Sequence, residues 1–562
     1  MSEEQLFDVL RNLWTICWLW FLIPSGVFGI LNSGTITTIN LNKMEIEIRA
    51  FRLQQYETSG KFFGSKSWKV IYQAVDLNES ALRKCVVIKW WDLINIDFED
   101  KFSAVLGAVL VILPKDLNEL SEKEYQTFLS IEQKFVSLRT ELAVYFAPNS
   151  TELVSLLSSV STNSIHLPST TAFQQLINSI MADNYQITST NSATTNLLTN
   201  SKIYNIIGQL NAQERGLPFI FIVAYYDTFG VVPGLTIGSD SNGSGVAVLL
   251  ELLRIFNYLY SLPSHNARYN LVFVLSAGGK FSFQGSRSFI DDFNEKYSDE
   301  KIALAICLDS LGKRTNSNLN KSSINIHLSK LPSSTSLTNK FISNLQNFEG
   351  NKTINLLTKK INLAADRLAW EHEIYNIRRI HSLTISHFEK FDDPERNSML
   401  DIPKNLDYSI LEENAHLIAN SLISFIFQLE TVQCLNLKEK KCSLLLNKQI
   451  NINKKRLETW INLFASKPRP TNELLLKNVL INNLFQVVKK YSENALISEV
   501  IINDFVLYEI NEDKLSGNIV KPAIFELLLA AGICVYLYVV YLLAFNAQKI
   551  LEGSIYKIKK YL

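Results

Sequence analysis

Residues 217–260 read LPFIFIVAYYDTFGVVPGLTIGSDSNGSGVAVLLELLRIFNYLY. The run Pro218–Tyr225 is almost wholly apolar and predicts a buried strand, whereas Gly245–Tyr260 carries apolar residues at helical spacing. A loop rich in glycine and polar residues joins the two. A buried strand followed by an amphipathic helix is typical of an α/β sheet with helices on both faces.

The same alternation continues along the chain. Strands are predicted at Asn270–Leu275 and Ile302–Leu308, a helix near Ser286–Phe293, and a later apolar stretch at Leu383–Ser386. We therefore predict a doubly wound α/β domain over residues 205–430, with its functional site at the carboxyl ends of the strands.

The regions on either side of this domain have other patterns. Residues 40–200 predict a mixed α/β N-terminal region, with strands in Trp68–Val75, Cys85–Trp91 and Ala104–Leu113 and helices at Glu122–Ser137 and near Ala172–Ala182. Residues 431–520 are rich in Lys, Glu, Asn and Leu and predict a helical region.

Two apolar segments indicate a membrane protein. Residues 1–31 contain the apolar run Leu13–Leu31 and predict a signal sequence, either cleaved or kept as an anchor. Residues 523–545 are long enough to span a bilayer at about 1.5 Å per residue. The tail, residues 546–562, is basic, so the positive-inside rule places it in the cytosol and the large body on the opposite side.

Short motifs refine the predicted cellular location of the protein. The last four residues, Lys559-Lys560-Tyr561-Leu562, resemble a dilysine retrieval signal, which predicts the endoplasmic-reticulum membrane. A lumenal body agrees with four glycosylation sequons, at Asn78, Asn149, Asn320 and Asn351. A fifth, at Asn242, lies inside a motif described below, and we expect it to be unmodified.

Cys434 and Cys442 are close enough in the sequence to form a local disulfide, although two free thiols fit equally well. The formal net charge of +1 argues against direct binding of nucleic acid.

Polar residues follow the predicted strands in a characteristic order. They are Tyr225 and Asp227 after the first strand, Asp240 before the long helix, Gly279-Lys280 after the next strand, Asp309 after the third, and His387 after the last. This order resembles the co-catalytic zinc aminopeptidase family and, within it, the catalytically degenerate nicastrin and nicalin branch. The segments that carry the resemblance are 222–230, 238–251, 278–286 and 361–387.

The resemblance assigns a former role to each position. Asp240 corresponds to the carboxylate that bridges two zinc ions and Asp309 to a ligand of one of them; both are present. His387 corresponds to the last ligand, with His381 and His372 as nearby alternatives.

Three of the family's functional groups are replaced. Tyr225 stands where the family has a zinc-binding histidine, so Asp227 has no histidine to orient. Gly279 stands at the catalytic base and Lys280 at a neighbouring ligand. Each zinc would keep two protein ligands, and catalytic zinc ordinarily has three. We therefore expect no catalytic residues, no metal, no cofactor and no enzyme activity, and an Asp240–Lys280 ion pair in place of the metal.

The resemblance implies a non-catalytic scaffold of the endoplasmic-reticulum membrane. Its implied partners are a large lumenal Nodal-modulator-like protein, a small multi-spanning membrane protein and the ribosome-associated translocon that handles multipass membrane proteins. Within the bilayer, Glu526 and the tyrosines Tyr536, Tyr538 and Tyr541 would contact partner helices or lipid.

Two alternatives stay open. One is a nicastrin-like subunit that recruits substrates to an intramembrane protease. The other is a metallo-aminopeptidase with a rearranged site that uses Glu371 or Glu373, which flank His372, as its base.

Overall fold

The computed structural model describes residues 45–76, 83–96, 107–164, 184–189, 198, 202–263, 266–297, 300–313, 323–350, 352–365, 367–428, 451–509, 512–520 and 523–561. The chain divides into two compact units, Met1–Ile46 and Glu47–Leu562, and only the last two residues of the first are described. Several sequence predictions lie outside the described residues: the N-terminal apolar segment, the helix near Ala172–Ala182, Cys434 and Cys442, and the sequons at Asn78, Asn320 and Asn351.

An eight-stranded mixed sheet forms the centre of the predicted α/β domain. Its strand order is β15 (Thr353–Thr358), β14 (Ser323–Leu328), β16 (Ser382–Ser386), β13 (Ile302–Leu308), β11 (Phe219–Tyr225), β12 (Asn270–Ser276), β10 (Lys202–Leu210) and β17 (Asn494–Ile501). Strands β12, β11, β13 and β16 are parallel, so their carboxyl ends meet at one edge of the sheet. Strand β10 is antiparallel to β12 and β17, and β14 is antiparallel to β16.

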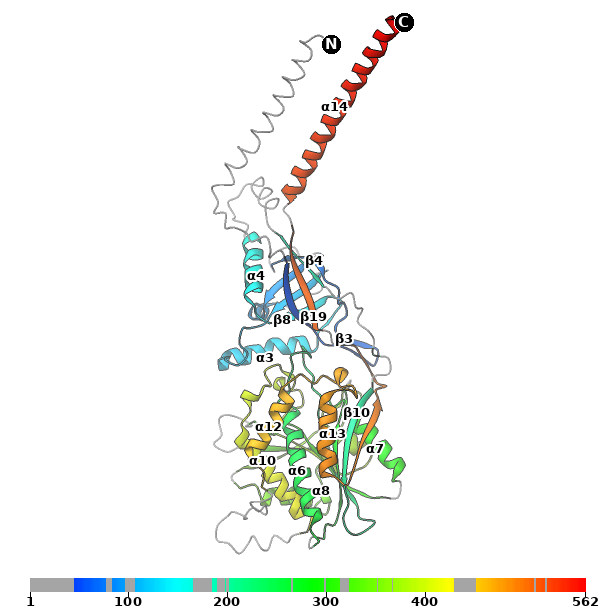
Figure 1. Ribbon diagram of the computed structural model, residues 1–562. Helices are drawn as coiled ribbons and strands as arrows, with labels where there is room; N and C mark the ends of the chain where they lie inside the picture. Colours follow the sequence, from blue (N-terminus) through cyan, green and yellow to red (C-terminus); the bar gives the residue numbers. More distant parts are fainter. Residues whose placement is uncertain are drawn as a thin grey trace. The chain divides into compact units, whose positions relative to one another are not determined.

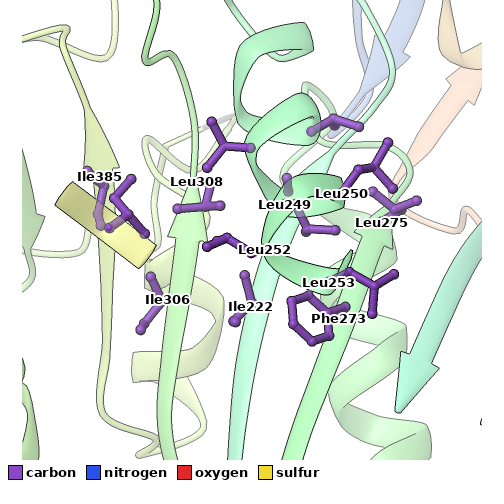
Figure 2. Packing of buried hydrophobic residues seen from close by; sticks show 14 of the residues in the cluster. Ile222, Leu249, Leu250, Leu252, Leu253, Phe273, Leu275, Ile306, Leu308 and Ile385 are labelled. Carbon is purple, nitrogen blue, oxygen red and sulfur yellow. The ribbon is translucent and has the colours of Figure 1, made fainter. Parts of the chain in front are cut away.

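Helices cover both faces of this sheet, as the sequence predicted (Figure 1). One face packs against α6 (Gly243–Ser261), α8 (Leu337–Asn347), α10 (Tyr408–Ile426), α12 (Lys454–Ala465) and α13 (Val479–Tyr491). The other packs against α7 (Gln284–Lys296) and α9 (His372–Ile377). Figure 2 shows leucines of α6, among them Leu249 and Leu253, against Ile222, Phe273 and Ile306 of three neighbouring strands. These strands are continuous apolar runs because both of their faces are buried.

The N-terminal region forms a second, barrel-like core. The strand order of the closed barrel is β1 (Glu45–Arg52), β19 (Glu512–Val520), β9 (Asn184–Ser189), β4 (Ile71–Val75), β5 (Cys85–Lys89), β6 (Ala108–Ile112) and β8 (Ala143–Ala147). Helix α3 (Glu122–Val136) begins with a capping box between Ser121 and Glu124. Its buried Phe128 stacks on Trp90 of the short helix η1 (Trp90–Asn95), with ring centroids 4.4 Å apart. Helix α4 (Thr151–Ser164) contacts β4 and β9.

A small third sheet joins strands from both ends of the chain. It contains β18 (Phe505–Leu507), β2 (Gln55–Thr58), β3 (Lys61–Ser65) and β7 (Arg139–Thr140), in that order.

The described part of residues 431–520 contains the expected helices and, in addition, strands that were not predicted. Helices α12 and α13 are present, but β17, β18 and β19 follow them and each belongs to a different sheet. Strand β19 contains Ser516, Gly517 and Asn518, which have low strand propensity, so its pairing with β1 and β9 overrides the local preference. The C-terminal region is therefore part of both the barrel and the central sheet.

The last helix, α14 (Ala523–Tyr561), has the properties of a membrane span (Figure 1). Its segment Glu526–Ala547 has a mean hydropathy of 2.4 and is not buried against the rest of the chain, and within the described residues it is the one helix long and apolar enough to cross a bilayer. The helix continues through most of the basic tail to Tyr561. A single span attached to a large folded body fits a single-pass membrane protein.

Candidate functional site

The seven residues singled out in the sequence lie at the carboxyl edge of the four parallel strands. Tyr225 is the last residue of β11, and Gly279, Asp309 and His387 come shortly after β12, β13 and β16. Asp240 lies in the loop just before α6, where the chain turns back over the sheet. Hydrogen bonds and ion pairs link these residues, so they form one buried cluster.

Tyr225 fills the space beside Gly279. A Cβ atom added at Gly279 would lie 2.3 Å from Cγ of Tyr225, so a side chain at position 279 does not fit while the tyrosine ring is there. The hydroxyl of Tyr225 donates a hydrogen bond to the carboxylate of Asp309 and also lies 2.8 Å from the carbonyl oxygen of Ser241. Burial and the nearby Asp309 raise the pKa of Tyr225 well above its usual value, so the hydroxyl stays protonated.

Asp309 is paired with a buried guanidinium that the sequence analysis did not identify. Nη2 of Arg396, in the short helix η2 (Pro394–Asn397), lies 3.2 Å from Oδ1 of Asp309, and Ser386 Oγ donates to Oδ2 at 3.0 Å. Burial alone would raise the pKa of Asp309, but Arg396, Lys280 and these hydrogen bonds lower it below the usual value. Asp309 is therefore an anion neutralised by a side-chain cation.

Arg396 is fixed by further contacts. It donates hydrogen bonds to the carbonyl oxygens of Ala369 and Phe391, each at 3.2 Å. Its guanidinium lies 4.4 Å from the ring centroid of Trp370. The side chain is 6% exposed, so this cation is part of the core of the site.

Asp240 does not form the ion pair with Lys280 that we expected. Its Oδ1 accepts a hydrogen bond from the backbone N–H of Gly312 at 2.7 Å, and Oδ2 lies 3.2 Å from Nδ1 of His387. Oδ1 is thus engaged by the backbone and Lys280 is directed at other oxygen atoms, which is the physical reason for the correction. Asp401 supports the same loop, because its carboxylate accepts hydrogen bonds from the backbone N–H groups of Asp240 and Ser241.

Lys280 instead donates to neutral oxygens. Its Nζ lies 3.0 Å from Ser241 Oγ and 3.2 Å from the carbonyl oxygen of Arg396. Burial, reinforced by the positive charge of Arg396, lowers the pKa of Lys280 to about 7, although the carboxylates of Asp309 and Asp227 oppose this shift.

Asp227 connects the cluster to the C-terminal region. It accepts hydrogen bonds from the backbone N–H of Gly279 at 2.9 Å and from Thr471 Oγ1 at 2.6 Å. Nearby, Arg469 donates to the carbonyl oxygens of Tyr226 and Gly238, both at 3.0 Å. Asp227 therefore orients the turn after β12.

These residues do not fit a zinc centre. Within the described part of the chain, no three His, Cys, Asp or Glu side chains are grouped so that they could hold a metal ion. Asp309 is bonded to a guanidinium, and an ammonium stands where the resemblance places a ligand. Zinc requires deprotonated N, S or O donors, so the guanidinium of Arg396 on Asp309 opposes zinc binding, and Lys280 adds to this opposition whenever it is protonated.

The Glu371-His372-Glu373 cluster lies in the protein interior. Glu371 is 2% exposed and accepts hydrogen bonds from Ser276 Oγ at 2.7 Å and Ser286 Oγ at 2.5 Å. Burial raises the pKa of Glu371 to about 7 and lowers that of His372 to about 3. None of the three lines the pocket described next, so neither glutamate is placed to activate a water molecule there.

A pocket of about 280 Å³ opens beside Gly279, Lys280 and Arg396. Lys280, Phe283, Arg367 and Arg396 line it from the α/β domain, and Glu132 of α3 lines it from the N-terminal region. Glu132 also fastens the two regions together, because its carboxylate accepts hydrogen bonds from Ser398 Oγ at 2.5 Å and from the backbone N–H of Met399 at 2.9 Å.

Arg396, Asp401, Arg469 and Thr471 were missed for a common reason. They lie in irregular segments after β16 and α12, where no helical or strand periodicity marks a functional position. The only local signal is the charged run Asp392-Asp393-Pro394-Glu395-Arg396, and such runs are ordinarily solvated loops.

Comparison with known proteins establishes the relationship. Residues 205–422 match the model of peptidase family M28. The Nicalin of Caenorhabditis elegans is 35% identical to this chain over 99% of both sequences. The chain belongs to the nicalin family. The human relative, named BOS complex subunit NCLN, is 31% identical over 88% of each chain. The crystal structure of the gamma-secretase component nicastrin covers 84% of this chain and 99% of its own, with a TM-score of 0.57 at 13% identity, which shows a shared fold.

Proposed function

We propose that this nicalin-family protein is a non-catalytic scaffold subunit of the endoplasmic-reticulum membrane. The observation that carries the proposal is the buried Arg396–Asp309 ion pair, with Lys280 close by, at the strand ends where the related peptidases place metal and base. The names of the relatives, which describe them as subunits of a complex, agree with a role in assembly.

The absence of catalysis follows from charge and packing. Hydrolysis by this family's chemistry needs a metal-bound water and a general base within hydrogen-bond reach of it. Position 279 has no side chain, and the ring of Tyr225 leaves no room for one. The retained Asp240 and His387 lie 3.2 Å apart and each contacts the backbone, Asp240 at Gly312 and His387 at Ser310, so they serve as internal contacts.

The proposed orientation places the body in the lumen and the basic tail in the cytosol. The positive charge that follows the apolar segment of α14 supports it. Among the sequons, Asn149 lies in the described part of the chain and is exposed, as a glycosylated residue must be. Asn242 is 1% exposed, so we propose that it is not modified.

The proposed partners are a large lumenal Nodal-modulator-like protein, a small multi-spanning membrane protein and the translocon for multipass membrane proteins. The exposed body and the exposed face of α14 provide separate surfaces for them. The fold shared with nicastrin supports a second candidate, in which the chain recruits substrates to an intramembrane protease.

Affinity purification of the full-length tagged chain in mild detergent separates the two candidates. The scaffold function predicts the three partners in the mass spectrum, whereas recovery of a presenilin-like protease in their place would support the second candidate and contradict the first. A matched variant, in which Glu526–Ala547 is replaced by an unrelated apolar helix of equal length, should lose the small membrane partner and keep the lumenal one.

A further inference from the structure

The pocket beside Lys280 contains hydrogen-bond donors that the protein does not use. An ammonium group has three N–H donors, and two of those of Lys280 are directed at Ser241 and at the carbonyl group of Arg396. Among the described residues, no carboxylate lies within 4.0 Å of its Nζ, although the residue lines the pocket.

Arg396 adds a second unused donor. Its Nη atoms bind Asp309 and two carbonyl groups, but its Nε is buried and has no hydrogen-bond partner among the described residues. Buried N–H groups without a partner are rare in folded proteins, because each has lost its hydrogen bonds to water without gaining others. Arg396 lines the pocket, so an acceptor in the pocket is a candidate partner for this group.

Arg367 is a third cationic residue in the lining of the pocket. Its guanidinium lies 5.1 Å from the ring centroid of Phe229 and 5.9 Å from that of Tyr56, and its ion-pairing capacity is unused among the described residues. Three acidic residues also line the pocket, Glu132, Asp392 and Asp393; Asp393 accepts a hydrogen bond from the backbone N–H of Glu395, and burial raises the pKa of Glu132 to about 8. With these acidic groups present, the pocket accommodates one added negative charge better than two.

The size of the pocket limits the ligand further. The pocket has a volume of about 280 Å³. An α-helix, with a diameter of about 10–12 Å, does not fit, whereas one side chain or one chain end does.

We propose that this pocket binds a single carboxylate of an extended peptide, either an Asp or Glu side chain or a C-terminal carboxylate. Lys280 and Arg396 donate the hydrogen bonds and Arg367 supplies further positive charge at the wall. The inference rests on the pocket alone and is independent of the partners proposed above.

Binding of three acetylated tripeptides to the full-length chain in mild detergent tests the proposal. One peptide is Ala-Ala-Ala with a free C-terminus, one is Ala-Asp-Ala amide, and the third is the neutral Ala-Asn-Ala amide. Ligand-observed NMR should detect binding of at least one carboxylate peptide and not of the neutral one. Whichever carboxylate peptide binds more tightly identifies the source of the carboxylate.

Two variants locate the interaction. Lys280→Gln should weaken binding by at least about tenfold, the usual effect of losing one charge-assisted hydrogen bond, since glutamine can still bond to Ser241. Lys340→Gln, the same charge change on the exposed face of α8, should leave binding unchanged. If Lys280→Gln fails to fold, Arg367→Gln provides the same test. Equal binding of the neutral peptide, no effect of either pocket substitution, or no carboxylate binding up to about 10 mM would overturn the proposal.

Discussion

Replacement of Arg396 by methionine should strongly destabilise the protein. Methionine keeps much of the side-chain volume against Trp370 but leaves Asp309, which is 1% exposed, without its partner at 3.2 Å. Removing one member of a buried ion pair costs about 3–5 kcal/mol, because the remaining charge is desolvated and uncompensated. In domains of about 150–250 residues each kcal/mol lowers the melting temperature by about 2–4 °C, so we expect a decrease of about 6–20 °C.

Thermal unfolding of the full-length chain in detergent, followed by tryptophan fluorescence, measures this loss. The matched control is Arg378→Met, which breaks an exposed pair with Asp291 at 2.6 Å and should cost about 0–1 kcal/mol. The double variant Arg396→Met/Asp309→Asn should recover at least half of the loss, because no buried charge remains unpaired. The reasoning is refuted if Arg396→Met is no more harmful than Arg378→Met, or if the double variant loses the sum of the two single effects.

Three further outcomes follow from single contacts. Burial raises the pKa of Glu132 to about 8, so between about pH 4.5 and 8 the folded chain keeps a proton that the unfolded chain releases. The melting temperature should therefore fall as pH rises through this window. Glu132→Gln should flatten this fall, and an unchanged slope would contradict the raised pKa of Glu132. Gly279→Ala should cost about 1–3 kcal/mol in thermal unfolding, because its Cβ would lie 2.3 Å from Cγ of Tyr225; an unaltered melting temperature would rule out this packing. Asn149→Gln should increase the gel mobility of the expressed chain by one glycan, since Asn149 is exposed, whereas Asn242→Gln should not. Unchanged mobility of Asn149→Gln would contradict the proposed glycosylation of this site, and a shift with Asn242→Gln would contradict the burial of Asn242.

The sequence predicts the central strands and helices because buried elements have apolar residues in a recognisable local pattern. Strands β11 and β13 are continuous apolar runs, and the predicted helix Gly245–Tyr260 corresponds to α6 at Gly243–Ser261. The edge strand β15 was not foreseen, because its residues are mostly exposed and have no apolar face to mark them. Strands β17 and β19 were missed because their partners lie hundreds of residues away along the chain.

The candidate site was likewise predictable from the sequence only in part. Residues placed directly after strands, such as Asp309 and Lys280, could be located from topology alone, because parallel strands bring their carboxyl ends together. The side chains that pair with these residues could not be located in this way. The expected Asp240–Lys280 pair was chemically reasonable, but Lys280 is directed at Ser241 and the carbonyl group of Arg396, and the cation on Asp309 is Arg396 from a segment without periodicity. Which opposite charges meet depends on loop paths, and a single sequence does not specify these.

We propose that side-chain cations have replaced the metal, and the zinc content of the purified chain is a direct test of this replacement. The full-length chain is purified in mild detergent, incubated with excess zinc, desalted and analysed by elemental mass spectrometry, with a zinc aminopeptidase treated in parallel. The account predicts far less than one zinc per chain, because Arg396 holds Asp309 and Lys280 stands beside it. One or two zinc ions per chain that remain after desalting would contradict it.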